Sequence, residues 1–269
     1  MIKCQIIGDP VRHSLSPYLH NAVYKKLGID DQYVFDAVQV SPPELGRYLE
    51  RARGGVVRGI SVTVPHKVGV MQYLDEIGEF SGQIGAVNTI VNENGKLSGH
   101  NTDTKGVLFP LNKRLGSVKG KTVLVLGAGG AARAAAFVLK KEGATVHVAN
   151  RTPSRAEALA KDSGAILHAL DEIDSLEFDI LFNATTVGLK DDRSLVPASV
   201  LKPEHIVFDA VYKSNPKEVT TLLKDAERVG ATTIDGLEML AYQAIRQIKR
   251  YTGRDIDGEA VLEILKARV

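Results

Sequence analysis

Lys67 follows a short apolar strand at a position suited to proton transfer. Residues 59–62 have strand character, the strand ends near Pro65, and Lys67 comes just beyond it. Lys67 would lie in the first turn of a helix, where the helix dipole disfavours positive charge and so favours release of a proton. Lys67 is therefore a candidate general acid–base. The competing interpretation is an ordinary solvated surface lysine.

Hydroxyl, amide and carboxylate side chains gather in three further segments of the N-terminal half. Residues 13–21 carry Ser14 and Ser16 at the expected start of a helix, where hydroxyl donors and the positive helix end suit a small carboxylate. Residues 84–90 and 99–106 place Asn, Thr and Asp among small residues near strand ends. Each segment alone also fits cap and turn chemistry, in which Ser16 before a proline is an N-cap.

A glycine-rich turn follows the very apolar strand at residues 122–126. The sequence Gly-Ala-Gly-Gly-Ala-Ala at residues 127–132 comes next and opens an alanine-rich helix. In this G-x-G-x-x-A pattern Gly127 permits a tight turn, Gly129 lets a pyrophosphate approach the backbone, and Ala132 lets the helix pack closely. Because strand and helix both flank the pattern, it favours dinucleotide binding over a turn without a ligand.

The end of the next strand, at residues 145–149, indicates which dinucleotide binds. NAD-binding sites usually carry Asp or Glu here for the ribose hydroxyls. This chain instead reads Asn150-Arg151-Thr152, with Arg155 following. A guanidinium can stack on adenine and pair with a 2′-phosphate, so the sequence favours NADP over NAD. The alternative is a solvated cluster at a helix start.

Composition excludes several classes of protein. The 269 residues are 44% apolar and 25% charged, as in globular proteins, and the formal charge of +2 leaves no basic stripe for nucleic acid. The seven histidines lack metal-binding spacing, and the lone Cys4 can form no intrachain disulfide. The apolar tract at residues 123–139 contains three glycines and Arg133, so it is not a membrane span. We expect no metal, no nucleic acid and no membrane partner, and a cytoplasmic location.

The elements that position these residues alternate between strands and helices, which predicts an α/β fold with mainly parallel sheets. We expect strands at residues 3–7, 33–38, 59–62, 122–126, 145–149, 179–182 and 206–211. A small, polar stretch at residues 116–120 suggests a break before a second domain. The prediction is an N-terminal α/β substrate domain of residues 1–116 and 237–269, made discontinuous by returning C-terminal helices, and a nucleotide domain of residues 117–236.

Together these segments resemble the shikimate dehydrogenase family, in order over nearly the whole chain. The motifs that carry the resemblance are residues 13–17 with 20–21, 62–67, 85–89, 99–103 with Gly106, 127–131, 150–152, 183–185 with Gly188, and 235–240 with Gln243. The resemblance implies NADPH-dependent reduction of 3-dehydroshikimate to shikimate, on the route to chorismate and aromatic amino acids. It also implies a substrate domain and a Rossmann NADP-binding domain facing each other across a cleft.

The resemblance implies roles for particular residues of this chain. Lys67 and Asp103 lie at the reacting carbon, and Asp103 orients the ammonium. The implied substrate-binding residues are Ser14, Ser16, Ser61, Thr63, Lys67, Asn88, Asp103, Tyr212 and Gln243. The implied NADP-binding residues are Gly127, Ala128, Gly129, Gly130, Ala131, Asn150, Arg151, Thr152 and Arg155, with Thr185 and Gly236 at the nicotinamide end.

Two positions depart from the family pattern, and two other functions remain open. Ser61 stands where Asn is commoner in the family, and the segment after Tyr212 is longer than the usual Tyr-x-Pro spacing. One alternative function is a quinate or dual-substrate dehydrogenase of broader substrate or NAD use, against which Arg151 and Arg155 argue. The other is a non-catalytic Rossmann dinucleotide sensor, in which Lys67 would be dispensable. We expect a monomer or a homodimer.

Overall fold

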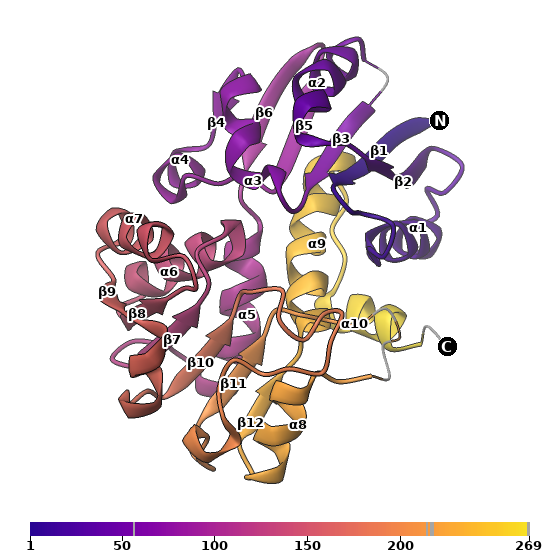
Figure 1. The fold of residues 1–269 in the computed structure, drawn as a ribbon. Helices are drawn as coiled ribbons and strands as arrows, with labels where there is room; N and C mark the ends of the chain where they lie inside the picture. The colour runs from indigo at the N-terminus through magenta and orange to yellow at the C-terminus, as the bar shows by residue number, and fades with distance from the viewer. Residues whose placement is uncertain (56, 214, 216–217, 268–269) are drawn as a thin grey trace. The chain divides into compact units, whose positions relative to one another are not determined.

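The computed structural model describes residues 1–55, 57–213, 215 and 218–267, and the chain forms two compact units (Figure 1). Unit 1 comprises Met1–Lys105 and Leu240–Val269, and unit 2 comprises Gly106–Met239. These limits differ from the sequence-based ones because they fall within two continuous helices, α5 (Asp103–Leu115) and α9 (Gly236–Thr252). The polar stretch at 116–120 is the turn between α5 and the next strand. The domain limits drawn from the sequence remain a prediction.

Unit 1 is built on a mixed six-stranded sheet of order β2-β1-β3-β5-β6-β4. Its strands are β1 (Ile2–Gly8), β2 (Tyr33–Gln39), β3 (Val57–Val62), β4 (Glu76–Ile77), β5 (Thr89–Glu93) and β6 (Lys96–His100). Strand β1 pairs in parallel with β2 and β3, as the alternation predicts. Strand β5 is antiparallel to both β3 and β6, and the two-residue turn Asn94-Gly95, with φ of 53° and 87°, closes the tight β5–β6 hairpin. The sequence-based list of strands missed this hairpin.

The helices of unit 1 cover its sheet and place side chains at the strand ends. They are α1 (Ser16–Lys26), α2 (Leu45–Arg53), α3 (His66–Gly69), α4 (Glu79–Ile84), most of α9, and α10 (Gly258–Lys266), with short 3₁₀ turns η1 (Pro42–Glu44) and η2 (Val70–Tyr73). Helix α1 begins at Ser16, and its N-cap is Leu15. The prediction of Ser16 as the N-cap is therefore wrong. Ser14 Oγ instead accepts from the Ser16 backbone N–H, which satisfies a donor of the first turn.

Unit 2 is built on a fully parallel six-stranded sheet of order β12-β11-β10-β7-β8-β9. Its strands are β7 (Thr122–Leu126), β8 (Thr145–Ala149), β9 (Ile166–His168), β10 (Ile180–Asn183), β11 (Ile206–Asp209) and β12 (Thr232–Ile234). The chain begins the sheet at its centre, runs outward through β8 and β9, and then returns to add β10 to β12 beside β7. This is the strand order of a Rossmann fold, in which ligands bind beyond the carboxyl ends of the central strands.

Helices α6 (Gly130–Lys141), α7 (Pro153–Ser163) and α8 (Thr221–Arg228) connect these strands, together with η3 (Leu170–Ser175) and η4 (Ala198–Val200). Helix α7 begins as its sequence predicts, with Thr152 as N-cap and Pro153 in the first helical position. Gly143 and Gly230 follow the ends of α6 and α8 with positive φ, as expected at helix stops.

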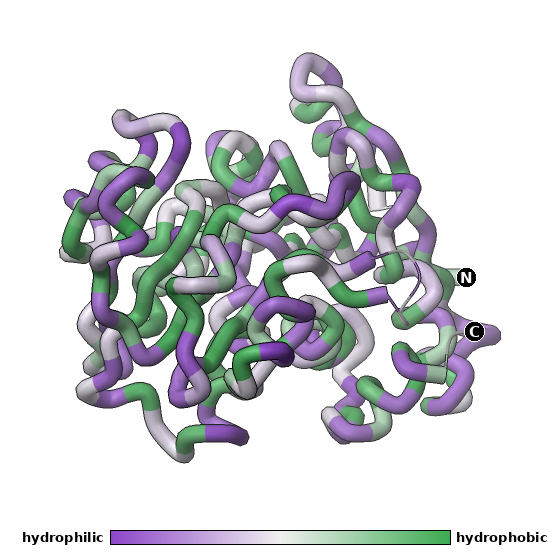
Figure 2. The backbone as a smooth tube through the Cα atoms, turned by 60° about the horizontal axis from the view of Figure 1, so that its bottom comes forward, coloured by the Kyte–Doolittle hydropathy of each residue, from purple (hydrophilic) through white to green (hydrophobic). Residues whose placement is uncertain are grey.

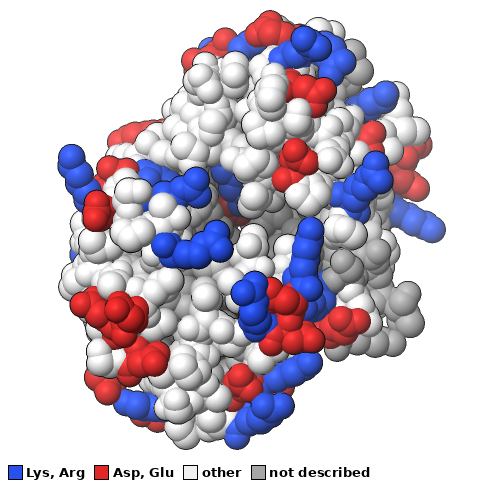
Figure 3. Space-filling model, viewed as in Figure 1, with Lys and Arg blue, Asp and Glu red and all other residues white. Residues whose placement is uncertain are grey.

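Each unit has its own hydrophobic core. In unit 1, Leu49, Ile60 and Leu97 are completely buried in a cluster between the sheet and α2. In unit 2, Leu126 and Leu181 belong to a second cluster beneath α8. Figure 2 shows hydrophobic stretches alternating with hydrophilic ones along the chain, and Figure 3 shows acidic and basic side chains interspersed on the visible face. No helix among the described residues is long and apolar enough to span a membrane.

Candidate active site

Lys67 and Asp103 form a close ion pair in unit 1. Lys67 lies in the first turn of α3, directly after the cis Val64–Pro65 peptide, and Asp103 is the first residue of α5. Lys67 Nζ donates to Asp103 Oδ2 at 2.5 Å, and the two side chains are 15% and 5% exposed. The structure thus brings together two side chains that are 36 positions apart in the sequence. The Lys67 side chain is therefore more exposed to solvent than that of Asp103.

The amide of Asn88 holds the other oxygen of Asp103. Asn88 lies just before β5 and is buried, and its Nδ2 donates to Asp103 Oδ1 at 2.8 Å. Asn88 Oδ1 accepts from the backbone N–H of Thr102 and from the hydroxyl of Thr89, both at 2.7 Å. The carboxylate is therefore bound on both oxygens, and this fixes its orientation toward Lys67.

Gln243, on α9, lies next to the same amide. Its Oε1 is 3.4 Å from Asn88 Nδ2 and 3.3 Å from the Thr102 hydroxyl, and its Nε2 donates to the Leu240 carbonyl. Four of the predicted substrate residues, Lys67, Asn88, Asp103 and Gln243, thus belong to one hydrogen-bonded cluster. Thr63 lies in the turn between β3 and α3, where its backbone N–H donates to Ile7 and its carbonyl accepts from His66.

Close backbone packing beneath Thr63 depends on Gly8. A Cβ added at Gly8 would lie 2.5 Å from Thr63 Cγ2 and 3.0 Å from the Val64 carbonyl oxygen. A side chain at position 8 would therefore push this turn, which carries Thr63 and leads to Lys67, out of place.

The hydroxyl of Ser61 is engaged elsewhere in unit 1. Ser61 is buried in β3, its Oγ donates to Gln247 Oε1 at 3.0 Å, and it lies 3.1 Å from the Tyr251 hydroxyl. Gln247 and Tyr251 both belong to α9. The geometry thus links Ser61 to a helix, and its predicted contact with substrate remains a prediction. Ser14 is partly exposed, whereas Ser16 is buried.

In unit 2, the turn after β7 leaves room for a phosphate group. Gly127 has φ of 113°, and a Cβ there would lie 3.1 Å from the Ala184 carbonyl oxygen, so only glycine fits without strain. Gly129 is the N-cap of α6 and has no side chain to cap the N–H groups of the first turn. A Cβ added at Gly129 would have no atom within 4 Å. Ala132 is completely buried. Gly127, Ala128, Gly129, Gly130 and Ala131 therefore fit a dinucleotide pyrophosphate.

The segment after β8 presents its polar side chains to solvent. Arg151, Thr152 and Arg155 are exposed, while Asn150 Nδ2 donates to the Thr152 carbonyl at 3.0 Å. Two guanidinium groups at the start of α7, with no acidic residue between positions 150 and 155, fit a 2′-phosphate better than a free 2′-hydroxyl.

A buried polar network fixes the turns after β10 and β11. Thr185 donates through its backbone N–H and its hydroxyl to Asn183 Oδ1, and Asn183 Nδ2 donates to Asp209 Oδ1 at 2.9 Å. Asp209 also accepts from the Thr220 hydroxyl and the Val211 N–H. Burial raises the pKa of Asp209 to about 6, against the opposite effect of these donors.

Gly236 begins α9 in a place where a side chain cannot fit. A Cβ there would lie 2.6 Å from the Ala210 carbonyl oxygen and 2.8 Å from the carbonyl carbon of Val211. Glycine at this position lets the helix approach the backbone after β11 directly. This backbone contact places Gly236 beside the turn that carries Tyr212.

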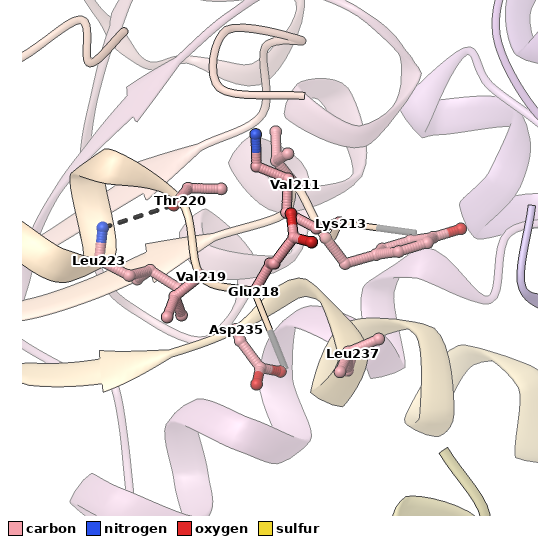
Figure 4. Close-up of a pocket in the computed structure, with 9 residues that line it drawn as sticks. Val211, Lys213, Glu218, Val219, Thr220, Leu223, Asp235 and Leu237 are labelled. Atoms are coloured by element: carbon pink, nitrogen blue, oxygen red, sulfur yellow. Dashed lines mark hydrogen bonds between the residues drawn. The ribbon is translucent and has the colours of Figure 1, made fainter. Parts of the chain in front are cut away.

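Tyr212 lines a small pocket in unit 2 (Figure 4). Side chains including Val211, Glu218 and Leu237 surround it, and its volume of about 20 Å³ suits a single water molecule rather than a substrate. Ser214 and Pro216, in the longer segment after Tyr212, lie outside the described residues. The predicted contact between Tyr212 and the substrate therefore stays a prediction. No group of three or more metal-ligating side chains occurs in the part of the chain that the structure describes.

Sequence reasoning missed three members of the cluster in unit 1. Thr89 and Thr102 lie inside motifs that the sequence singled out for polar contacts, but neither was assigned a role of its own. Gln247 was not noticed, although it follows Gln243 by four positions and so lies on the same face of α9. Two glutamines four positions apart on an otherwise apolar helix face were the signal in the sequence that could have identified Gln247.

Two family models match most of the chain. A family model for the shikimate dehydrogenase substrate binding domain matches residues 6–90, and one for shikimate / quinate 5-dehydrogenase matches residues 111–240. The shikimate dehydrogenase (NADP(+)) of Pyrococcus abyssi is 44% identical over 266 residues, 98% of this chain and 97% of that protein.

Solved structures of similar proteins cover the whole chain. A shikimate dehydrogenase in complex with NADP+ has a TM-score of 0.91 at 40% identity and covers 100% of this chain and 96% of that one. The enzyme of Thermus thermophilus, in complex with NADP(H) and shikimate, has a TM-score of 0.89 at 36% identity and covers 100% of both chains. The two family models, the relative that is 44% identical over 98% of this chain and the shared fold show that the chain belongs to the shikimate dehydrogenase family.

Proposed function

We propose that this protein catalyses the reversible, NADPH-dependent reduction of 3-dehydroshikimate to shikimate, on the route to chorismate and the aromatic amino acids. It is an NADP-dependent oxidoreductase acting on a CH–OH group. The observation that carries the proposal is the 2.5 Å contact between Lys67 Nζ and Asp103 Oδ2, in the unit whose sequence matches the substrate binding domain.

NADPH, when bound, supplies a hydride for the carbonyl carbon of the ketone. The residues of the chain manage the proton. As negative charge develops on the carbonyl oxygen, Lys67 donates a proton from Nζ to it, and the product is a secondary alcohol. The resulting neutral amine regains a proton from solvent, to which the Lys67 side chain is 15% exposed. In the reverse direction the neutral amine accepts the proton of the alcohol.

Asp103 keeps the amine in place while the proton moves. One of its oxygens accepts from Lys67 and the other from Asn88, so its carboxylate remains oriented when the charge of Lys67 changes. The same carboxylate is an acceptor for a hydroxyl of the substrate. Asn88, Thr63 and Gln243 are further hydroxyl ligands, Ser14 and Ser16 are ligands for the carboxylate, and Ser61 and Tyr212 complete the proposed substrate-binding residues.

The dinucleotide is assigned to unit 2. Its pyrophosphate is bound by the residues from Gly127 to Ala131 at the start of α6, because Gly129 leaves the N-terminal N–H groups open. Its 2′-phosphate is bound by the residues at the start of α7, and the nicotinamide end lies by Thr185 and Gly236. The residues assigned to the 2′-phosphate are Asn150, Arg151, Thr152 and Arg155. We further propose that the enzyme is cytoplasmic and acts as a monomer or homodimer.

A direct assay tests the function. Purified protein with 3-dehydroshikimate and NADPH should show falling absorbance of the reduced cofactor, and shikimate with NADP+ should show the reverse. The same assays with NADH in place of NADPH, and with quinate in place of shikimate, distinguish the proposed enzyme from a quinate dehydrogenase of broader cofactor use. A clear preference for NADH or quinate would overturn the assignment, and binding of NADPH without turnover would favour a dinucleotide sensor.

A further inference from the structure

The polar groups behind Asp103 form one continuous chain of hydrogen bonds through unit 1. Asn88 Nδ2 donates to Asp103 Oδ1 at 2.8 Å, and the Thr89 hydroxyl donates to Asn88 Oδ1 at 2.7 Å. Gln247 Nε2 donates to Thr89 Oγ1 at 3.2 Å, and the Ser61 hydroxyl donates to Gln247 Oε1 at 3.0 Å. All five residues are at most 3% exposed, so water does not compete for these groups.

The direction of every bond in this chain is fixed by a backbone group. The orientation of the Asn88 amide is fixed because the atom that accepts the backbone N–H of Thr102, at 2.7 Å, has to be the amide oxygen Oδ1. The orientation of the Gln247 amide is fixed in the same way, because the atom 3.3 Å from the backbone carbonyl of Asn88 has to be the donor nitrogen Nε2. Gln247 donates to the oxygen of the Thr89 hydroxyl, so that hydroxyl directs its hydrogen to Asn88 Oδ1, at 2.7 Å, in preference to the more distant Thr102 Oγ1, at 3.1 Å. Each donor therefore points toward Asp103.

We propose that Gln247 is a positioning residue for the Lys67–Asp103 pair. This inference rests on the proposed function and adds a residue of α9 to it. Gln247 touches neither member of the pair. It acts by orienting the Thr89 hydroxyl, which polarises the Asn88 amide and so strengthens the hydrogen bond from that amide to Asp103. Hydrogen bonds in such a series reinforce one another in a buried site.

The alternative is a purely structural role, in which Gln247 only satisfies buried polar groups between α9 and the sheet. That role predicts lower stability with unchanged chemistry. The positioning role predicts a change at Asp103 itself, because the Asn88 amide that binds the carboxylate loses one of its polarising donors, the Thr89 hydroxyl, and keeps the Thr102 backbone N–H. The two roles are separated by measuring the chemical step and the Asn88 amide apart from stability.

Two substitutions break the chain at neighbouring links. Gln247→Met keeps the length of the side chain and removes its donors, and Thr89→Val keeps the shape and removes the hydroxyl. Each should lower kcat about three- to tenfold, as expected for one lost hydrogen bond, with a smaller change in KM for 3-dehydroshikimate. Each should also shift the pH at which kcat is half-maximal.

The double variant and a conservative variant complete the test. Because both substitutions break the same path, the double variant should lose no more than the worse single variant. Thr89→Ser keeps the hydroxyl and should restore most of kcat. Ile248→Val, a buried change on the same helix outside the network, should lower stability and leave kcat unchanged.

The side-chain amide of Asn88 gives a readout that needs no activity. Its ¹⁵N-resolved proton signals should move upfield in Gln247→Met and Thr89→Val, and should remain near their original position in Thr89→Ser and Ile248→Val. Folded variants with unchanged kcat, pH profile and Asn88 signals would overturn the proposal, as would losses that multiply in the double variant. A wild-type protein that does not reduce 3-dehydroshikimate would instead refute the proposed function, and the Asn88 signals would still test the hydrogen-bond chain.

Discussion

Replacing His20 by Phe should make the stability of the protein less sensitive to acid. His20 is completely buried in α1, where its ring stacks on Phe35 with a centroid distance of 4.0 Å and an interplanar angle of 22°. Burial lowers the pKa of His20 from 6.5 to about 3, against a smaller opposite effect of Gln247. Phe offers a similar flat ring for the stack without a group that gains a proton.

The size of the effect follows from proton linkage. Between pH 6.5 and 3 the unfolded chain binds a proton at His20 and the folded chain does not, so the stability present above pH 6.5 is lost as the pH falls. With these two pKa values, the free energy of unfolding of wild type should fall by about 2 kcal/mol relative to His20→Phe between pH 7 and pH 5. Other titrating groups contribute equally to both proteins and cancel.

Urea unfolding at pH 7, 6 and 5, followed by circular dichroism, measures this difference. Tyr24→Phe is the matched control, because it removes a buried polar group from the same cluster. Burial raises the pKa of Tyr24 further above its ordinary value near 10, so the phenol keeps its proton throughout this range. The effect of Tyr24→Phe should therefore not depend on pH. A constant gap between wild type and His20→Phe over the same range would refute the reasoning.

Four further outcomes are expected. Lys67→Ala should lower kcat about 10²- to 10⁴-fold with little change in KM, measured by steady-state or rapid-mixing kinetics. Full turnover by this variant would exclude Lys67 as the proton donor. Arg151→Ala should weaken NADPH about tenfold and leave NADH nearly unaffected in titrations, whereas equal weakening would contradict the 2′-phosphate assignment. Gly236→Ala should cost about 1–3 kcal/mol in denaturant unfolding, because its Cβ meets backbone at 2.6 Å, and an unchanged midpoint would contradict that clash. Asp209→Asn should stabilise the protein at pH 7 by up to about 3 kcal/mol, because burial raises the pKa of Asp209 to about 6 and so makes its charged form costly in the folded state. This gain should shrink as the pH falls through about 6, and a gain that does not depend on pH would contradict the reasoning.

Local patterns were sufficient to predict most of unit 2. The strand at residues 122–126, the glycine turn and the alanine-rich helix each follow from short-range preferences, and the structure forms the strand with the same bounds and begins the helix at Gly130. The Thr152–Pro153 helix start is equally local, because a cap and a first-turn proline act within a few residues. The preference for NADP also required only the residue types after β8.

Local patterns were insufficient where long-range pairing decided the outcome. The β5–β6 hairpin reverses the strand direction in unit 1, and its two-residue Asn94-Gly95 turn was the unused signal. The unit limits fall inside α5 and α9 because a helix remains continuous when its two ends pack in different units. No local preference marks such a limit.

The sequence by itself determined the alternation of strands and helices, the glycine turn and the types of side chain available for proton transfer. Only the tertiary structure decided that Lys67 meets Asp103, that Asn88 holds the carboxylate, and that Ser61 turns to Gln247. Lys67 and Asp103 are 36 positions apart along the chain, and Ser61 and Gln247 are 186 positions apart. Hydrogen-bond direction and burial depend on which atoms face each other in space, and residue spacing does not contain that information.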